Sequence, residues 1–307
     1  MNAPDEHYPL ILNTGRVRDQ WHTMTRTGIA PKLNQHKPEP FVEVHPIDAT
    51  TYALLQNTLA KIESRWGSML ARVQITDSQQ LGNLFVPMHW TQQLASQGRM
   101  GPLINPVVDP ISKQPESKHT PVSIEAYHPA WQGFILSRQE LALADTEYRV
   151  TIKGAHFYRY ELAGDSARDD WRNIISKQLV DSVQWQEYQD TSKGSYRAAR
   201  LIDNQLEAVI FIATDNNLPE RSWLSSLFAQ PVLSLNERKA LLSGRPAQGI
   251  ADVGAIVCAC FNVGEKTLRA AIKEKALKTH QQVGACLKAG TNCGSCVPEI
   301  KALLAKA

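Results

Sequence analysis

The chain has 307 residues, of which 43% are apolar and 21% charged, a composition typical of globular proteins with hydrophobic cores. Its net charge of +3 is too small for a typical nucleic-acid-binding protein, and no apolar run approaches the roughly eighteen residues of a membrane span. Because the N-terminus shows no basic start followed by an apolar stretch, no secretory signal is predicted and the cytoplasm is the expected location. Five cysteines are too few for a disulfide scaffold.

Residues 1–125 have the pattern of strands and loops. Apolar or alternating runs predict strands at 8–14, 41–46, 81–90 and 121–127, and a hairpin over 59–75 that turns at Trp66-Gly67. Asp48 is the expected N-cap of a short helical turn over 48–56. The loop over 101–119 is rich in proline and polar residues, and so long a loop in a compact β domain indicates that a ligand holds it.

Residues 126–250 predict a second unit of α+β type. Strand-like sequence covers 148–164, and a hairpin is expected over 196–214 around Asp203-Asn204. A helix over 166–179 is expected to open at Ser166 and Asp169, and short helices at 219–228 and 236–244, the last with Asn236 as its cap. No catalytic constellation is present here, and the tryptophans of this unit are expected to serve packing: Trp171, Trp185 and Trp223.

Residues 251–307 predict a small helical unit with two close cysteine pairs. Cys258 and Cys260 form a C-x-C motif, Cys293 and Cys296 form a C-x₂-C motif, and each pair precedes a helical pattern. Two such pairs indicate a metal centre, and their spacing alone leaves open an iron–sulfur cluster and a structural Cys₄ zinc site. Eight Lys/Arg against four Asp/Glu in this unit suit an anionic cluster and are expected to raise its potential.

The cysteine-containing segments resemble the bacterioferritin-associated ferredoxins. The resemblance is carried by VCACFNVGEKTLRAAI (257–272) and VGACLKAGTNCGSCVPEI (283–300). It implies one [2Fe-2S] cluster, with four ligands: Cys258, Cys260, Cys293 and Cys296. Cys286 falls outside the motif and is expected to be a small packing residue.

A second unusual stretch is LNTGRVRDQWHTMTRTG (12–28), which has neither helical nor strand periodicity. Guanidinium groups, an imidazole, hydroxyls and glycines in one loop suit an extended, phosphate-bearing cofactor. A solvated loop is the alternative from the residues alone, because no general phosphate-binding motif is present.

Together with VHPIDA (44–49), LFVPMHW (84–90) and NPVVDPISKQPESK (105–118), this stretch resembles the C-terminal domain of the bis-molybdopterin-guanine-dinucleotide oxidoreductases, in the order found in assimilatory nitrate reductases. The resemblance implies a six-stranded double-psi β-barrel. It also implies contacts to the pterin dinucleotides from Thr14, Gly15, Arg16, Trp21, His22, Thr23, Thr25 and Arg26. Weaker candidates are His89, Asn105 and Lys118; of all these, His22 is the strongest, whereas a histidine in an apolar strand, as His89 is, more often has a structural role.

The prediction is therefore an α+β, multi-domain chain. It comprises a dinucleotide-binding barrel (1–125), an α+β connecting region (126–250) and a helical [2Fe-2S] domain (251–307). The resemblance implies the C-terminal part of a molybdenum enzyme that reduces nitrate to nitrite, either as a piece of a longer polypeptide or as a separate subunit. No catalytic residue is assigned, because the [4Fe-4S] segment and the molybdenum ligand of such enzymes are not in this sequence.

The expected partners are the remainder of the catalytic subunit and a flavoprotein or ferredoxin that donates electrons; no nucleic acid or membrane partner is expected. Two alternatives remain open. One is a stand-alone electron-transfer or adaptor subunit of another, formate dehydrogenase-like molybdoenzyme. The other is a structural zinc module.

Overall fold

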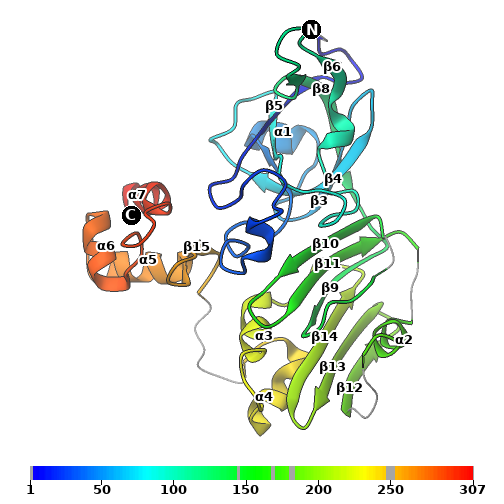
Figure 1. Cartoon of the computed structure of the whole chain (residues 1–307), viewed down its shortest axis with the longest axis vertical. Helices are drawn as coiled ribbons and strands as arrows, with labels where there is room; N and C mark the ends of the chain where they lie inside the picture. The colour runs from blue at the N-terminus through cyan, green and yellow to red at the C-terminus, as the bar shows by residue number, and fades with distance from the viewer. Residues whose placement is uncertain (1–2, 144–145, 167–169, 180–183, 247–252, 307) are drawn as a thin grey trace.

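The computed structural model describes the whole chain except residues 1–2, 144–145, 167–169, 180–183, 247–252 and 307. Three parts follow one another along the chain: a barrel, an open sheet with helices on both sides, and a small helical part beside the barrel (Figure 1). The predicted α+β class with a six-stranded barrel is confirmed.

The barrel is closed, and its strands follow the order β1-β5-β2-β4-β3-β8. Pairing is parallel between β1 and β5 and between β2 and β4, and antiparallel elsewhere. Alternation explains the first strand, in which Leu10, Leu12 and Thr14 point inward and are buried. The bounds are β1 Leu10–Gly15, β2 Phe41–Val44, β3 Leu59–Glu63, β4 Ser68–Ile75, β5 Asn83–Pro87 and β8 Thr120–Tyr127.

The apolar and alternating sequence patterns predicted most of these strands. The hairpin β3–β4 turns at Trp66-Gly67, as predicted. The helix α1 (Pro46–Thr51) differs from its prediction, because it begins two residues before Asp48. Its N-cap is His45, whose ring nitrogen accepts the Ile47 N–H, and Asp48 lies buried in the first turn and accepts the N–H of Gly82 at 2.8 Å. Asp48 thus connects the helix to the start of β5.

The long loop after β5 is not structureless. It contains a 3₁₀ turn, η2 (Gly101–Leu103), and a two-stranded hairpin of β6 (Asn105–Val108) and β7 (Pro115–Glu116). A further 3₁₀ turn, η1 (Thr27–Ile29), lies in the loop after β1.

The open sheet has six antiparallel strands in the order β10-β11-β9-β14-β13-β12. The turn between β13 and β14 is the predicted one, with Asp203 and Asn204 both left-handed (φ 48° and 65°), as a tight hairpin requires. The sequence reading gave no strand at β9 or β12 and did not resolve the hairpin β10–β11. The bounds are β9 Trp131–Ser137, β10 Tyr148–Lys153, β11 Tyr158–Gly164, β12 Gln184–Asp190, β13 Ser195–Ile202 and β14 Gln205–Ala213.

Helices cover both faces of this sheet (Figure 1). On one face lie α3 (Arg221–Leu227), α4 (Leu235–Ala240) and the 3₁₀ turn η3 (Leu241–Ser243), and on the other lies α2 (Trp171–Ser176). Two caps differ from prediction. The helix α2 begins after Asp170 rather than at Ser166, and Asp169 lies outside the described residues; α4 is capped by Ser234, in a capping box with Glu237, and not by Asn236.

The C-terminal part is helical, as predicted. A short ribbon of β15 (Ile256–Cys258) and β16 (Val263–Gly264) precedes α5 (Glu265–Glu274), α6 (His280–Leu287) and α7 (Val297–Ala305). These helices bury a small apolar core that includes Leu268, Val283 and Ile300 together with Cys258 and Cys296.

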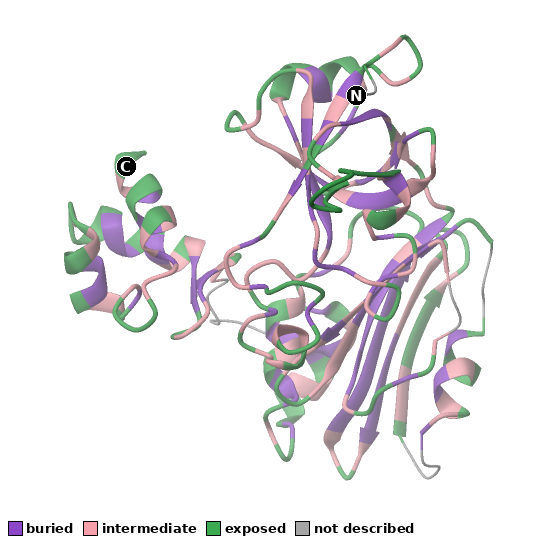
Figure 2. Cartoon of the chain, turned by 45° about the horizontal axis from the view of Figure 1, so that its top comes forward, coloured by how far each residue is buried: buried purple, intermediate pink, exposed green. Residues whose placement is uncertain are grey.

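The barrel and the sheet share a core. Met24, Leu59 and Trp90 from the barrel side pack in one cluster with Tyr148 and Val150 of β10. Figure 2 shows buried residues running through the barrel strands and through the sheet. In the part of the chain that the structure describes, no helix is both long and apolar enough to cross a bilayer.

Candidate functional site

The end of β1 meets the loop that precedes β8. The buried Thr14 donates a hydrogen bond from Oγ1 to the carbonyl oxygen of Ser117 at 2.7 Å, and Lys118 Nζ donates to the carbonyl oxygen of Thr14. Two predicted site residues more than a hundred positions apart are therefore neighbours. Gly15 lies opposite Pro87 where β1 runs parallel to β5, and a Cβ there would approach Phe85 to 2.7 Å.

The loop after β1 presents a cationic and aromatic surface. The Arg16 guanidinium lies over the Trp21 ring at 5.0 Å, and the Trp21 and His22 rings meet edge to face at 4.7 Å. Trp21 is 55% exposed, and the backbones of His22 and Met24 are left-handed (φ 45° and 59°). Such conformations in residues other than glycine persist only where the surroundings enforce them.

The polar side chains of this loop face solvent rather than the core. Met24 is buried between them, which makes the loop two-sided. The exposed predicted residues are Arg16, Trp21, His22, Thr23, Thr25 and Arg26. Hydroxyl and guanidinium donors on one open surface are the groups that bind phosphates.

His89 lies directly beneath this surface and is fully buried. Its Nε2 accepts the N–H of Val17 at 2.9 Å, and its Nδ1 donates to the carbonyl oxygen of His22 at 2.6 Å, so the ring is neutral with its proton on Nδ1. Burial lowers the pKa of His89, and the charge of Arg16 adds to that effect. Both ring nitrogens are used within the protein, which fits the structural role that the sequence favours for His89.

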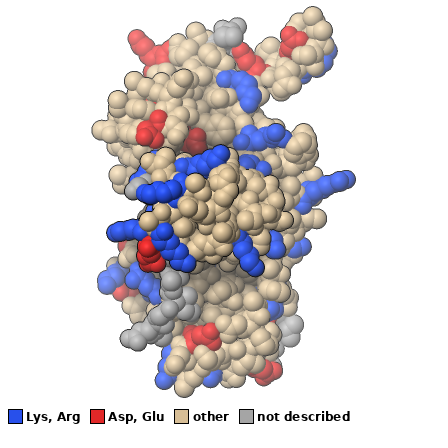
Figure 3. Space-filling view, turned by 90° about the vertical axis from the view of Figure 1, so that its left-hand side faces the viewer, with Lys and Arg blue, Asp and Glu red and all other residues tan. Residues whose placement is uncertain are grey.

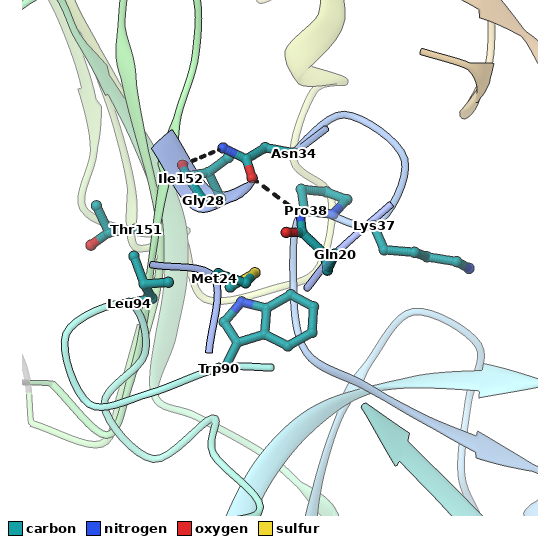
Figure 4. A pocket seen from close by; sticks show the side chains of 10 residues that line it. All are labelled: Gln20, Met24, Gly28, Asn34, Lys37, Pro38, Trp90, Leu94, Thr151 and Ile152. Atoms are coloured by element: carbon teal, nitrogen blue, oxygen red, sulfur yellow. Dashed lines mark hydrogen bonds between the residues drawn. The ribbon is translucent and has the colours of Figure 1, made fainter. Parts of the chain in front are cut away.

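The opposite side of the loop rests on the sheet (Figure 4). Asn34 Nδ2 donates to the carbonyl oxygens of Gly28 and Lys153, at 2.8 and 3.0 Å, and Asn34 Oδ1 accepts from Gln20 Nε2 at 3.1 Å. Gln20, Gly28 and Asn34 line a small cavity of about 10 Å³ together with Thr151 and Ile152 of β10. The region 126–250, to which the sequence assigned no role, thus supports the loop. Asn105 lies elsewhere, on β6, where it donates to Glu116 at 3.0 Å.

The four cysteines of the two motifs lie as two pairs, each with one member from each motif. Cys260 Sγ and Cys293 Sγ are 3.4 Å apart, and Cys258 is close enough to Cys296 to share a hydrogen bond with it. Cys258 and Cys296 are buried in the domain core, whereas Cys293 is exposed and Cys260 half-buried. A cluster with two irons, each bound by two thiolates, fits this arrangement.

Within the described residues, no three His, Cys, Asp or Glu side chains lie close enough together to hold a single metal ion. The loop before α7 turns at Gly290 and Gly294, whose φ values of 84° and 74° favour glycine. The Ser295 hydroxyl lies 3.1 Å from Cys293 Sγ, and its hydrogen bonds to that sulfur lower the pKa of Cys293. Burial has the opposite effect on Cys296, whose pKa rises to about 11.

Cys286 and the lysines lie away from these pairs. Cys286, on α6, accepts a hydrogen bond from Lys275 Nζ at 3.2 Å, and Lys273 lies in the last turn of α5. Figure 3 shows this side of the molecule, on which Lys and Arg are spread widely around the domain rather than gathered at one point.

The sequence reading missed a contact between the barrel loop and the cysteine domain. Arg18 donates to the carbonyl oxygen of Val257, beside Cys258, and its guanidinium lies 3.2 Å from Glu299 on α7. His36 Nε2 also lies 2.9 Å from Glu299, and Asp19 accepts from Ser295 at 3.4 Å. These residues carry no local signal, because charged residues in loops are more often solvated than paired.

Two family models match parts of the chain. Residues 10–121 match the molydopterin dinucleotide binding domain, and residues 256–306 match the BFD-like [2Fe-2S] binding domain. The chain therefore contains both domains, and both cofactors named by the sequence resemblance are supported.

Curated relatives extend the similarity to nearly the whole chain. A nitrate reductase of Klebsiella oxytoca is 44% identical over 98% of this chain and 34% of its own length. A nitrate reductase of Shewanella frigidimarina is 25% identical over 98% of this chain and 35% of its length. The F420-dependent formate dehydrogenase subunit alpha of Methanocaldococcus jannaschii is 35% identical over 40% of this chain and 17% of its length. The chain thus spans about a third of the length of each of these two nitrate reductases.

Proposed function

We propose that this chain, which combines a molydopterin dinucleotide binding domain with a BFD-like [2Fe-2S] binding domain, forms the C-terminal part of a molybdenum enzyme that reduces nitrate to nitrite. The observation that carries the proposal is the arrangement of four thiols in two pairs, beside a loop whose exposed surface bears arginines and hydroxyls. The 44% identity to a nitrate reductase over 98% of the chain supports nitrate as the substrate.

When bound, the molybdenum cofactor would supply the two-electron reduction of nitrate, and the cluster would carry electrons one at a time. The chain's own residues bind and orient these groups. Arg16 and Arg26 offer charged donors for phosphates of the dinucleotide, and Thr23 and Thr25 offer hydroxyls. Cys258, Cys260, Cys293 and Cys296 would hold the cluster. The proposed partners are the remainder of the catalytic subunit and a flavoprotein or ferredoxin donor, and the proposed location is the cytoplasm.

The first test concerns iron. The chain purified without oxygen should contain about two irons and give a rhombic spin-half signal after reduction with dithionite. One zinc and no signal would contradict the cluster and favour the structural zinc module.

The second test concerns the dinucleotide. In the enzyme assembled with the remainder of the catalytic subunit, the double variant R16Q/R26Q should lose molybdenum, because two charged phosphate donors are removed from an exposed loop. The control is R269Q, an exposed arginine of α5 that pairs with Glu265 on the same helix. Unchanged molybdenum in R16Q/R26Q would contradict the assignment of the loop.

Formate is the second candidate substrate, because a formate dehydrogenase subunit is 35% identical over 40% of the chain. The assembled enzyme should reduce nitrate with a reduced dye as donor. Oxidation of formate without nitrate reduction would replace the proposed substrate while leaving both cofactor assignments intact.

A further inference from the structure

The barrel loop contacts α7 through two basic residues, Arg18 and His36. Both lie against the carboxylate of Glu299. Arg18 and His36 lie 3.2 and 2.9 Å from the two carboxylate oxygens of Glu299. Their side chains are only 17% and 9% exposed, although Glu299 itself is 42% exposed. The basic side chains of the loop are therefore largely removed from water at this contact, and Glu299 of the cysteine domain supplies the negative charge beside them.

A third basic group of the barrel loop interacts with the same carboxylate through its charge. Lys37 follows His36, and Glu299 is the strongest of the charges that act on its ammonium group. Burial raises the pKa of Glu299, but the hydrogen bond of His36 and the charges of Arg18 and Lys37 outweigh burial and hold that pKa below its usual value. An ionised Glu299 is thus favoured by groups from the barrel loop, in addition to its place in the first turn of α7.

The same loop reaches the backbone and side chains next to the thiols. Arg18 binds the carbonyl oxygen of Val257, the residue before Cys258, and Asp19 accepts from Ser295, the residue before Cys296. Arg18 and Asp19 stand two and three positions after Arg16, which lies on the surface proposed for the dinucleotide. One short loop thus has the dinucleotide surface on one side and the cysteine domain on another.

We propose that Arg18, His36 and Glu299 form an electrostatic latch that holds the [2Fe-2S] domain against the dinucleotide-binding loop, and so fixes the distance between the two proposed cofactors. The inference rests on the proposed function. Arg18, His36 and Glu299 are positioning residues, since none of them ligates iron. The more open thiols, Cys293 and Cys260, stay accessible to an electron donor while the latch is closed, and Phe261 beside Cys260 is 39% exposed.

The chain offers a closely matched pair of variants. Glu299 lies in the first turn of α7 and Glu265 in the first turn of α5, each after a cysteine motif, and their side chains are 42% and 40% exposed. Glu265 pairs with Arg269 of its own helix, at 2.6 Å, and not with the barrel loop. E299K therefore replaces the carboxylate of the latch with a positive charge opposite Arg18, whereas E265K makes the same change in the first turn of another helix without touching the latch.

The experiment is small-angle X-ray scattering on the full chain, with iron content measured in each sample. E299K should increase the radius of gyration and the maximum dimension as the domain leaves the barrel, and R18Q should do so in part, whereas E265K should match the unaltered chain. Added salt should enlarge the unaltered chain as well, but less than E299K does, because Glu299 is partly exposed and partly buried ion pairs are screened less than exposed ones. Equal scattering from E299K and E265K, with equal iron content, would overturn the latch.

A second readout separates the latch from the proposed function. In the assembled enzyme, the pre-reduced cluster should be reoxidised by nitrate more slowly in E299K than in E265K, while its reduction by dithionite keeps the same rate in both. Unchanged reoxidation in E299K would overturn the positioning role even if the domain moves. Absence of iron from the unaltered chain would instead contradict the cluster itself, whatever the scattering shows.

Discussion

The thiols of Cys293 and Cys286 have different neighbours, although both belong to the C-terminal domain. Cys293 lies 3.4 Å from Cys260 and 3.1 Å from the Ser295 hydroxyl, whereas Cys286 contacts Lys275 on the side away from the pairs. C293S should therefore lose most of its iron and visible absorbance, because one thiolate ligand is removed. C286S should keep both, and iron analysis of the two purified variants checks this. Equal loss in both variants would contradict the ligand assignment.

His89 provides a pH-dependent support for the dinucleotide-binding loop. Its folded pKa lies below the ordinary value of 6.5, so on acidification the unfolded chain binds this proton first. The contribution of His89 to the free energy of unfolding is therefore complete above about pH 6.5 and decreases as the pH falls below it. A protonated ring cannot accept the N–H of Val17, which gives the physical reason.

The measurement is denaturant unfolding at a series of pH values for the unaltered chain and for H89Q. H89Q should lose about 1–3 kcal/mol at pH 7.5, the cost of leaving a buried partner unsatisfied. The difference between the two proteins should shrink below pH 6.5. A difference that stays constant across this range would show that folding does not lower the pKa of His89.

At the scale of elements, the orientation of α5 decides which basic residues act on the cluster. The helix has ten residues and is about 15 Å long, and its N-terminus, not its C-terminus, lies next to the cysteine ribbon. Lys273 and Lys275 lie at and just beyond the other end of α5, and their distance along the helix from its N-terminus exceeds the screening length of about 8 Å at physiological ionic strength. The expected effect of the lysine excess on the potential is thus weaker than the sequence suggested.

K273Q/K275Q should leave the reduction potential of the cluster nearly unchanged, and R18Q should lower it. Arg18 should affect the potential more than the lysines do. Its charge acts on Cys296, and it binds the carbonyl oxygen of Val257, the residue before Cys258. A redox titration followed by paramagnetic resonance measures both. A larger shift in the lysine variant than in R18Q would restore the original expectation.

Elements with complete local signals were predictable, and those without were not. The hairpin at Asp203-Asn204 has the residues that a left-handed two-residue turn needs, and the strand pattern around it is clear. The strand β9 has five buried residues in succession, from Gly133 to Ser137, and such a run shows no alternation to identify it. For α4, Ser234 and Asn236 are both good caps, and only the bond of Ser234 to Glu237 decides between them.

The candidate sites follow the same division. The four cysteines could be found from their spacing, because a metal centre needs its ligands in close pairs. Three contacts could not be found in this way: the hydrogen bonds of His89, those of Asn34 to the sheet, and the contacts of Glu299. The contacts of Asn34 and Glu299 join segments more than a hundred residues apart, and those of His89 join segments about seventy residues apart. A single sequence carries no signal for such pairings.

At the scale of the molecule, charged side chains join the barrel to the sheet beside their shared apolar core. Arg72 of β4 binds Glu39 at 3.0 Å, and Glu39 also lies 3.5 Å from Arg159 of β11. Arg159 continues to Glu161 at 2.6 Å, and Glu161 binds Arg221 of α3 at 2.7 Å. This chain of ion pairs runs from the barrel through the sheet to a helix on its face. The barrel and the sheet are therefore expected to unfold together.

Glu161 is the most buried carboxylate of this network. Its side chain is 1% exposed and lies between two arginines, so its loss should have the largest effect on the network. Burial alone would raise the pKa of Glu161, but Arg159 and Arg221 lower it to about 2. Since the folded pKa lies below the ordinary 4.5, its stabilising contribution is complete above pH 4.5 and is lost as the pH falls towards 2. E161Q should cost about 3–5 kcal/mol at neutral pH, because it removes the buried carboxylate that pairs with both Arg159 and Arg221.

Denaturant unfolding of the full chain, followed by fluorescence of the tryptophans in both parts, measures this loss. E187Q is the control, since Glu187 forms a more exposed pair with Arg172 and should cost less than about 1 kcal/mol. In E161Q the signals from Trp90 in the barrel and Trp171 beside the sheet should shift to lower denaturant concentration together. A shift confined to the sheet signal would show that the network stabilises one part only, and that the dinucleotide-binding loop does not depend on the sheet for its stability.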